Sequence, residues 1–227
     1  MKKILLVFGA GGSLGKDAVK VFLKKDFDLF YLFDSKKLSY NNDKIVYYQT
    51  GDLTKEDNVV EAFSTIEFEK NAQYYLFNTV GGFGGGNKIV ETEFSDWQRM
   101  FDINVTISFL LAKQFFISVK ESKGGAICFT SALTSVRPQE GKIAYGTSKS
   151  SLNYLVKTLV KEGKNYNISV NAIAPSILDT TENREWVRDK SMMIRASEIG
   201  ELVYSLFMNK NIVSGNIIEL HFSLSQE

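Results

Sequence analysis

Residues 1–22 decide the fold; they read Met1-Lys-Lys-Ile-Leu-Leu-Val-Phe-Gly9-Ala-Gly-Gly-Ser-Leu-Gly15-Lys-Asp-Ala-Val-Lys-Val-Phe22. The run Ile4–Phe8 is continuously apolar and short, which is typical of a buried parallel strand. A turn rich in glycine follows, and from Ser13 to Phe22 apolar residues recur at helical spacing. A strand, a glycine turn and a helix together aim backbone N–H groups at a diphosphate. The stretch predicts a dinucleotide-binding unit; an ordinary glycine-rich turn is the alternative that these residues leave open.

The composition limits the chemistry. The 227 residues are 44% hydrophobic and 23% charged, which predicts one globular α/β domain over residues 1–227. A net charge of +1 gives no indication of a nucleic-acid or anionic-membrane partner. Cys128 and His221 are the only cysteine and histidine, so we expect no disulfide framework, metal cluster or histidine-based triad. The reacting groups must be Tyr, Lys, Ser, Asn or carboxylates.

Apolar strands alternate with helices along the whole chain. Strands are expected at 4–8, 28–33, 45–49, 74–77, 125–130, 168–173 and 215–220, and helices at 13–22, 54–63, 95–119, 145–162 and 196–208. Thr54 is the expected N-cap of the second helix. This alternation predicts a doubly wound, Rossmann-type parallel sheet with helices on both faces and ligands at the carboxyl ends of the strands. The apolar stretch that ends at Gly9 is too short for a signal peptide, and no other segment is expected to cross a membrane. The predicted location is therefore cytoplasmic.

The helix expected at 95–119 is apolar on more than one side. A sheet covers only one side of a helix, so this pattern favours a subunit interface. A lid from another part of the chain is the alternative.

Asp34 ends the second predicted strand, nineteen residues after Gly15. A carboxylate there can accept the ribose hydroxyls of an adenosine and repels a 2′-phosphate. NAD(H) is therefore favoured as cofactor. Lys36 and Lys37 follow closely and could pair with that phosphate, so NADP(H) stays open.

Tyr145 and Lys149 are four residues apart at the start of a predicted helix, which places both side chains on one face. An ammonium close to a phenol favours the phenolate and lowers its pKa. Such a tyrosine can give a proton to a carbonyl oxygen while hydride arrives from a nicotinamide. The spacing alone is weak evidence, because Tyr40 and Lys44 share it in an unrelated turn. Its position downstream of a dinucleotide loop makes it informative.

The order of these motifs resembles the short-chain dehydrogenase/reductase family over essentially the whole chain. Asn78-Thr-Val-Gly81 is similar to the family's Asn-Asn-Ala-Gly motif, and Ala174–Thr180 resembles its carboxamide-binding segment. The resemblance implies a homodimer or homotetramer that acts on a small molecule. It implies a nicotinamide dinucleotide bound by Gly9, Gly11, Gly12, Ser13, Leu14, Gly15, Asp34, Asp52, Leu53, Asn78, Val80, Gly81, Tyr145, Lys149, Pro175, Ile177 and Thr180.

The resemblance also assigns catalytic roles. It implies that Tyr145 is the acid/base, that Lys149 binds the nicotinamide ribose and lowers the tyrosine pKa, and that Asn104 helps to hold a proton-relay water. One departure concerns the serine that usually stands thirteen positions before the tyrosine. That position is Ala132, and Ser131 is one residue early. Either Ser131 serves through a longer loop, or no serine does; in the second case the barrier for a simple ketone rises by about 3–4 kcal/mol.

Several functions remain open at this stage. The family's common activity is transfer of hydride between NAD(H) and a small carbonyl or alcohol. Within the family, dihydropteridine reductases act on a quinonoid substrate and also lack this serine. The segments Gly81–Asn87 and Leu178–Arg184 resemble segments of these enzymes. A 3-oxoacyl-acyl-carrier-protein reductase is a further alternative, and a dinucleotide-binding redox sensor is the non-enzymatic one. We expect Phe83 to face the substrate and Trp186 to belong either to a lid or to a peripheral helix.

Overall fold

The apolar runs of the sequence form the strands of one parallel sheet in the computed structural model, which describes residues 1–222. The sheet order is β3-β2-β1-β4-β5-β6-β7, and every neighbouring pair is parallel. The strands are β1 (Lys2–Phe8), β2 (Leu29–Asp34), β3 (Ile45–Gln49), β4 (Ala72–Asn78), β5 (Gly125–Thr130), β6 (Ile168–Pro175) and β7 (Ile217–Leu220). The chain reverses its direction across the sheet between β1 and β4, so the ligand crevice of such a fold lies there.

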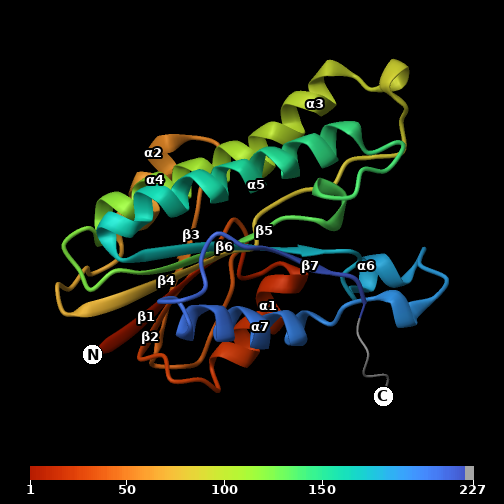
Figure 1. Cartoon of the computed structure of the whole chain (residues 1–227). Coiled ribbons are helices and arrows are strands. Elements are labelled where there is room, and N and C mark those ends of the chain that lie inside the picture. The colour runs from red at the N-terminus through yellow and green to blue at the C-terminus, as the bar shows by residue number, and fades with distance from the viewer. Residues whose placement is uncertain (223–227) are drawn as a thin grey trace.

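Helices cover both faces of the sheet, which confirms the predicted fold class (Figure 1). On one face lie α1 (Ser13–Phe22) and α7 (Ala196–Met208). On the other lie α2 (Glu56–Ser64), α4 (Ile107–Val119) and α5 (Ile143–Gly163), with α3 (Phe94–Phe101) extending from α4. The short helix α6 (Thr181–Arg184) projects near the carboxyl ends of the strands.

The alternation of side chains along each strand divides the core in two. Ile4 and Leu6 of β1 pack with α2, α4 and α5, whereas Leu5 and Val7 pack with α1 and α7. All four are fully buried. Because β1 is covered on both faces, its sequence from Ile4 to Phe8 is continuously apolar rather than alternating.

The predicted cap at Thr54 is wrong. Lys55 is the N-cap of α2, and the Thr54 hydroxyl instead donates to Asp52 Oδ1 at 2.7 Å. The Asp52 side chain also accepts the Thr54 N–H at 3.0 Å, so Asp52 and Thr54 form a local turn before the helix. That competing turn moves the start of the helix by one residue.

The helix predicted at 95–119 consists of α3, a π-helical turn (Asp102–Thr106, η2) and α4. By length and composition Phe94–Val119 could cross a membrane, which corrects the expectation that no such segment exists. In the fold, α4 packs against α2, α5, β4 and β5. This packing accounts for the apolar residues on one side of α4. Its outward residues Phe109 and Ile117 are about half exposed.

Candidate active site

A cavity of about 420 Å³ lies between the glycine turn, the end of β2 and the loop after β3; we call it the glycine-loop cavity. The N–H groups of Gly9 and Ala10 both donate to Phe33 O, at 2.8 and 3.1 Å, and pin the turn to β2. Gly9 has φ +82°, and a Cβ on Gly15 would lie 2.1 Å from Gly9 O. These two positions therefore require glycine.

Asp34 lies at the edge of this cavity, as its place after β2 predicts. Its Oδ2 accepts the Gly11 N–H at 2.8 Å and its Oδ1 accepts the Lys36 N–H at 2.9 Å. These bonds fix the carboxylate beside the turn. Lys36 lines the same cavity, so the charges that favour and oppose a 2′-phosphate are both present.

Asp52 and Leu53, from the loop after β3, also line the glycine-loop cavity. The hydrogen bonds that Asp52 accepts from Thr54 hold the pKa of its carboxyl below the usual value. Leu53 is buried and belongs to the core, so it offers an apolar surface to the cavity.

The segment after β4 joins this cavity to a second one. Val80 lines the glycine-loop cavity, and Thr79 and Gly81 line both. Asn78 lines neither. Its side chain is buried, accepts the Val80 N–H at 3.0 Å and donates to Ser108 Oγ at 3.2 Å. Asn78 therefore stabilises the turn after β4 through a hydrogen bond and does not line either cavity.

The second cavity, of about 340 Å³, contains Tyr145 and Lys149 from the first turns of α5; we call it the Tyr145 cavity. Lys149 Nζ donates to Thr130 O at 2.7 Å and is completely buried inside the protein. A Cβ on Gly81 would lie 3.0 Å from the same Nζ, so the ammonium reaches the junction of the two cavities. The predicted pair therefore lies next to the glycine turn.

Burial controls the titration of both groups. It raises the pKa of Tyr145 to about 12 and lowers the pKa of Lys149 to about 7. The direction for Tyr145 is opposite to the lowering expected from the sequence. The cause is burial, because the phenolate loses its hydration inside the protein.

Asn104 lies in the π-helical turn and is fully buried. Its Oδ1 accepts the Gly82 N–H at 3.1 Å, and its Nδ2 donates to Gly82 O and to Ser148 Oγ, both at 3.1 Å. The Asn104 side chain thus connects α5 to the segment Gly81–Asn87 after β4, which we call the glycine segment. It positions the wall of the Tyr145 cavity and does not line that cavity itself.

Ser131 and Ala132 both border the Tyr145 cavity. The Ser131 hydroxyl, however, donates to Asn153 Oδ1 at 2.7 Å and is buried against α5. The one-residue slip from the family pattern therefore leaves a methyl group at the expected position and directs the serine hydroxyl to the helix behind it.

The segment after β6 forms the far wall. Pro175, Ser176 and Ile177 line the Tyr145 cavity. Thr180 does not line it, because its Oγ1 accepts the Asn183 N–H at 3.2 Å and caps α6. A parallel bridge between Leu178 and Ile194 closes the base of the α6 segment.

Leu14 and Ser13, from the start of α1, were both predicted to meet the cofactor. Leu14 lines the Tyr145 cavity. Ser13 is exposed, and its hydroxyl lies 3.5 Å from Glu182 Oε2 of α6. The α6 segment therefore reaches across the crevice to the glycine turn.

Two aromatic rings line the Tyr145 cavity from opposite segments. Phe83, in the glycine segment, contacts the Tyr145 ring edge-on at a centroid distance of 5.0 Å. Trp186 extends from the α6 segment. The two side chains are 61% and 63% exposed, so both offer apolar surface to a ligand. Leu133, Thr134 and Lys142 also line the cavity, and no spacing in the sequence indicated them. Asn183, from the segment Leu178–Arg184 noted in the sequence, lines it as well.

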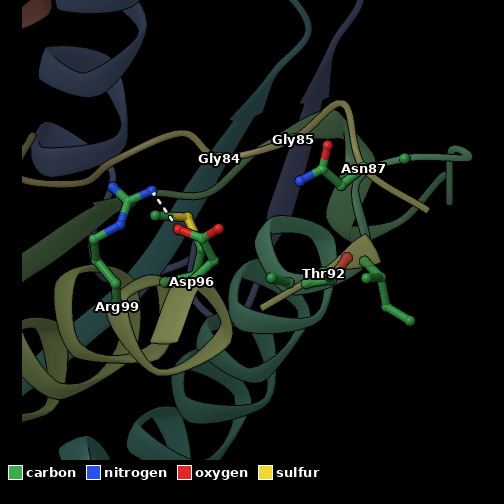
Figure 2. Close-up of a pocket in the computed structure, with 10 residues that line it drawn as sticks. Gly84, Gly85, Asn87, Thr92, Asp96 and Arg99 are labelled. Carbon is green, nitrogen blue, oxygen red and sulfur yellow. Dashed lines mark hydrogen bonds and ion pairs between the residues drawn. The ribbon is translucent and has the colours of Figure 1, made fainter. Parts of the chain in front are cut away.

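A smaller pocket of about 160 Å³, drawn in Figure 2, is formed by the glycine segment, α3 and the loop before α5. Gly84 and Gly85 form part of its wall. The Arg99 guanidinium lies 3.3 Å from the Asp96 carboxylate, so the main charges of the pocket are paired with each other. The pocket contains neither Tyr145 nor Lys149, and we assign it no part in the reaction.

The residues around the glycine turn fit a dinucleotide. A Cβ on Gly12 would meet only Gly9 O, at 3.4 Å, so the absent side chain leaves the cavity open. Thr50 Oγ1 is buried beside this cavity without a hydrogen-bond partner. The crevice, the carboxylate at the end of β2 and the Tyr145–Lys149 pair are together the arrangement typical of a dinucleotide-binding site in a doubly wound fold.

Comparison with known proteins gives the family. The sequence model of the family described as short chain dehydrogenase matches residues 3–191. The chain therefore belongs to the short-chain dehydrogenase/reductase family.

Individual relatives are more distant. Tropinone reductase-like 1 of Erythroxylum coca is 35% identical over 66% of this chain and 57% of its own length. Dihydropteridine reductase of Dictyostelium discoideum is 25% identical over 93% of this chain and 90% of its own. The structure of ElxO with NADP bound has a TM-score of 0.85 at 21% identity, over 97% of both chains. The chain spans less than two thirds of the first plant relatives, and the structural likeness shows the shared fold.

Proposed function

We propose that this protein is an NAD(H)-dependent reductase of small carbonyl compounds, with Tyr145 as the acid. The observation that supports it best is that Tyr145 and Lys149 share one cavity, which joins the glycine-loop cavity at Gly81. A bound nicotinamide dinucleotide supplies the hydride. Tyr145 then gives its proton to the carbonyl oxygen, and Lys149 holds the ribose side of the cofactor near the junction.

The titration of Tyr145 suits a proton donor. A phenol with a pKa of about 12 stays protonated over the neutral range, and a proton donor is what a carbonyl acceptor needs. Removing a proton from an alcohol would require the phenolate, which burial disfavours.

Asp34 supports NAD(H) as the cofactor. Its carboxylate is fixed by two backbone N–H groups at the place where an adenosine ribose would lie, and its charge opposes a 2′-phosphate. Lys36 in the same cavity and the NADP of ElxO point toward NADP(H) instead. Comparing the two reduced cofactors in one assay decides between them.

Reduction of a planar quinonoid compound is a second candidate. The Ser131 hydroxyl is bound to Asn153, and a quinonoid acceptor spreads the developing charge, so it depends less on a donor at one oxygen. The two exposed rings of Phe83 and Trp186 offer faces to a planar ring. Similarity to Dictyostelium dihydropteridine reductase over most of both chains also supports it.

The test is oxidation of NADH and NADPH by the purified protein with benzil, 9,10-phenanthrenequinone and a quinonoid dihydropterin. The proposal expects turnover with NADH, and the preferred acceptor separates the two candidates. Tyr145→Phe should lower kcat by at least about 10²-fold and leave NADH binding unchanged. Binding of NADH without turnover of any acceptor, and a silent Tyr145→Phe, would instead indicate a redox sensor.

We also propose that the protein assembles as a homodimer or homotetramer through α4 and α5. The two helices lie side by side with their outer faces uncovered in Figure 1. Phe109 and Ile117 on α4 and Tyr154 on α5 are exposed there. Burial of such apolar side chains is the usual driving force of a permanent interface.

A further inference from the structure

The turn between β5 and α5 contains three side-chain hydroxyl groups, and two of them are hydrogen-bonded to Asn153 of α5. Ser131 Oγ donates to Asn153 Oδ1 at 2.7 Å. Ser135 Oγ accepts a bond from Asn153 Nδ2, also at 2.7 Å, and donates to Ala132 O at 2.6 Å. These bonds hold the turn, which includes a short 3₁₀ helix (Leu133–Ser135, η3), firmly on α5. Neither serine is available to a substrate.

The third hydroxyl belongs to Thr134 and has no partner. Its Oγ1 is buried, and the residue is 9% exposed. A buried hydroxyl without a hydrogen bond costs about 1–3 kcal/mol, so native proteins seldom keep one without a function. Within residues 1–222, Thr50 and Ser169 also bury an unpartnered hydroxyl, but of the three residues only Thr134 lines the Tyr145 cavity.

The position of Thr134 is close to the acid. A Cβ added to Gly146, the neighbour of Tyr145, would lie 3.4 Å from Thr134 O. Thr134 also lines an outer groove of about 530 Å³, so the residue borders both this groove and the Tyr145 cavity. Because Oγ1 itself is buried, it reaches a ligand in the cavity only after a rotation about the Cα–Cβ bond.

We infer that Thr134 donates the hydrogen bond to the substrate oxygen that Tyr145 protonates. This inference rests on the proposed function and deepens it, because it supplies the donor that Ala132 lacks. In the step, the carbonyl carbon accepts hydride from the reduced cofactor, and the electron pair of the C=O bond moves to the oxygen. The oxygen takes the Tyr145 proton. Thr134 keeps its own proton and stabilises the developing charge.

The experiment compares Thr134→Val, which preserves shape and removes the hydroxyl, with Thr134→Ser, which restores it. Thr158→Val is the matched control, because Thr158 is exposed on the far part of α5. Each variant is assayed with NADH and benzil or the quinonoid dihydropterin. We expect Thr134→Val to lower kcat with benzil by about 10²-fold without lowering the NADH affinity. Its melting temperature should be equal to or above that of the wild type, because the variant no longer buries an unpartnered hydroxyl. Thr134→Ser should recover most of the rate, and the loss with the quinonoid acceptor should be smaller.

Ser131→Ala tests the rival donor and should lower stability rather than kcat, because its hydroxyl is bound to Asn153. Unchanged turnover in Thr134→Val, or a large loss of kcat in Ser131→Ala alone, overturns the role of Thr134 and leaves the proposed function intact. If the wild-type protein binds NADH but reduces no acceptor, both proposals fail. Thr134→Ala is assayed as well, so that the result stands if the valine variant does not fold.

Discussion

Replacing Lys149 by Met should remove a specific pH dependence of stability. The Lys149 ammonium is buried and donates a hydrogen bond to Thr130 O, and burial lowers its pKa from 10.5 to about 7. Between these two values the unfolded chain binds a proton that the folded chain does not. The free energy of unfolding therefore rises with pH across this window, and the rise is absent below about pH 7, where both states are protonated.

The magnitude follows from the shift. Each unit of pKa difference corresponds to about 1.4 kcal/mol, and the linkage relation gives a gain of about 2 kcal/mol between about pH 7 and pH 9 for this group alone. Methionine has a similar length and no charge, so the variant should lack this gain. Relative to wild type, it should be most stable at the acidic end and should lose that advantage as the pH rises.

The assay is urea unfolding of both proteins without cofactor at several pH values between about 6 and 9, followed by circular dichroism. The quantity of interest is the difference between the two unfolding free energies at each pH. Lys157→Met, on the exposed side of the same helix, is the control and should track the wild type. If the difference between wild type and Lys149→Met stays constant across the range, the buried ammonium is not shifted and the reasoning is refuted.

Four further predictions concern the cofactor site and the outer face of α4. Gly12→Ala should fold normally but lower NADH affinity at least about 10-fold, because its Cβ would enter the open cavity. Gly15→Ala should lose about 1–3 kcal/mol of stability, because its Cβ would lie 2.1 Å from Gly9 O. Melting curves with and without NADH distinguish the two, and an unchanged NADH affinity in Gly12→Ala contradicts this placement of the cofactor. Asp34→Ser should raise the kcat/KM ratio of NADPH to NADH by about 10-fold, since it removes the charge that repels a 2′-phosphate; an unchanged ratio would show that the carboxylate does not set the preference. Phe109→Glu should reduce the mass measured by light scattering to that of a monomer at low protein concentration; a mass equal to wild type would exclude the outer face of α4 as the interface.

The sequence determined the fold because the relevant signals are local. A five-residue apolar run, a glycine turn and a helical repeat within residues 1–22 specify one βα unit, and repetition of that pattern specifies a parallel sheet. The i, i+4 spacing of Tyr145 and Lys149 likewise fixes their common face whatever surrounds them. Asp34 could be placed for the same reason, because the carboxyl end of a parallel strand always lies at the ligand edge.

Tertiary structure decided everything that depends on direction or on burial. Ser131 borders the correct cavity, but only the packing of the β5–α5 turn on Asn153 shows that its hydroxyl faces the other way. Thr134 had no signal in the sequence, because its importance comes from lacking a partner, and partners are brought together by the fold. The pKa of Tyr145 rises instead of falling for a related reason: spacing along a helix sets which charges are near, whereas the water removed from around them is set by the whole protein.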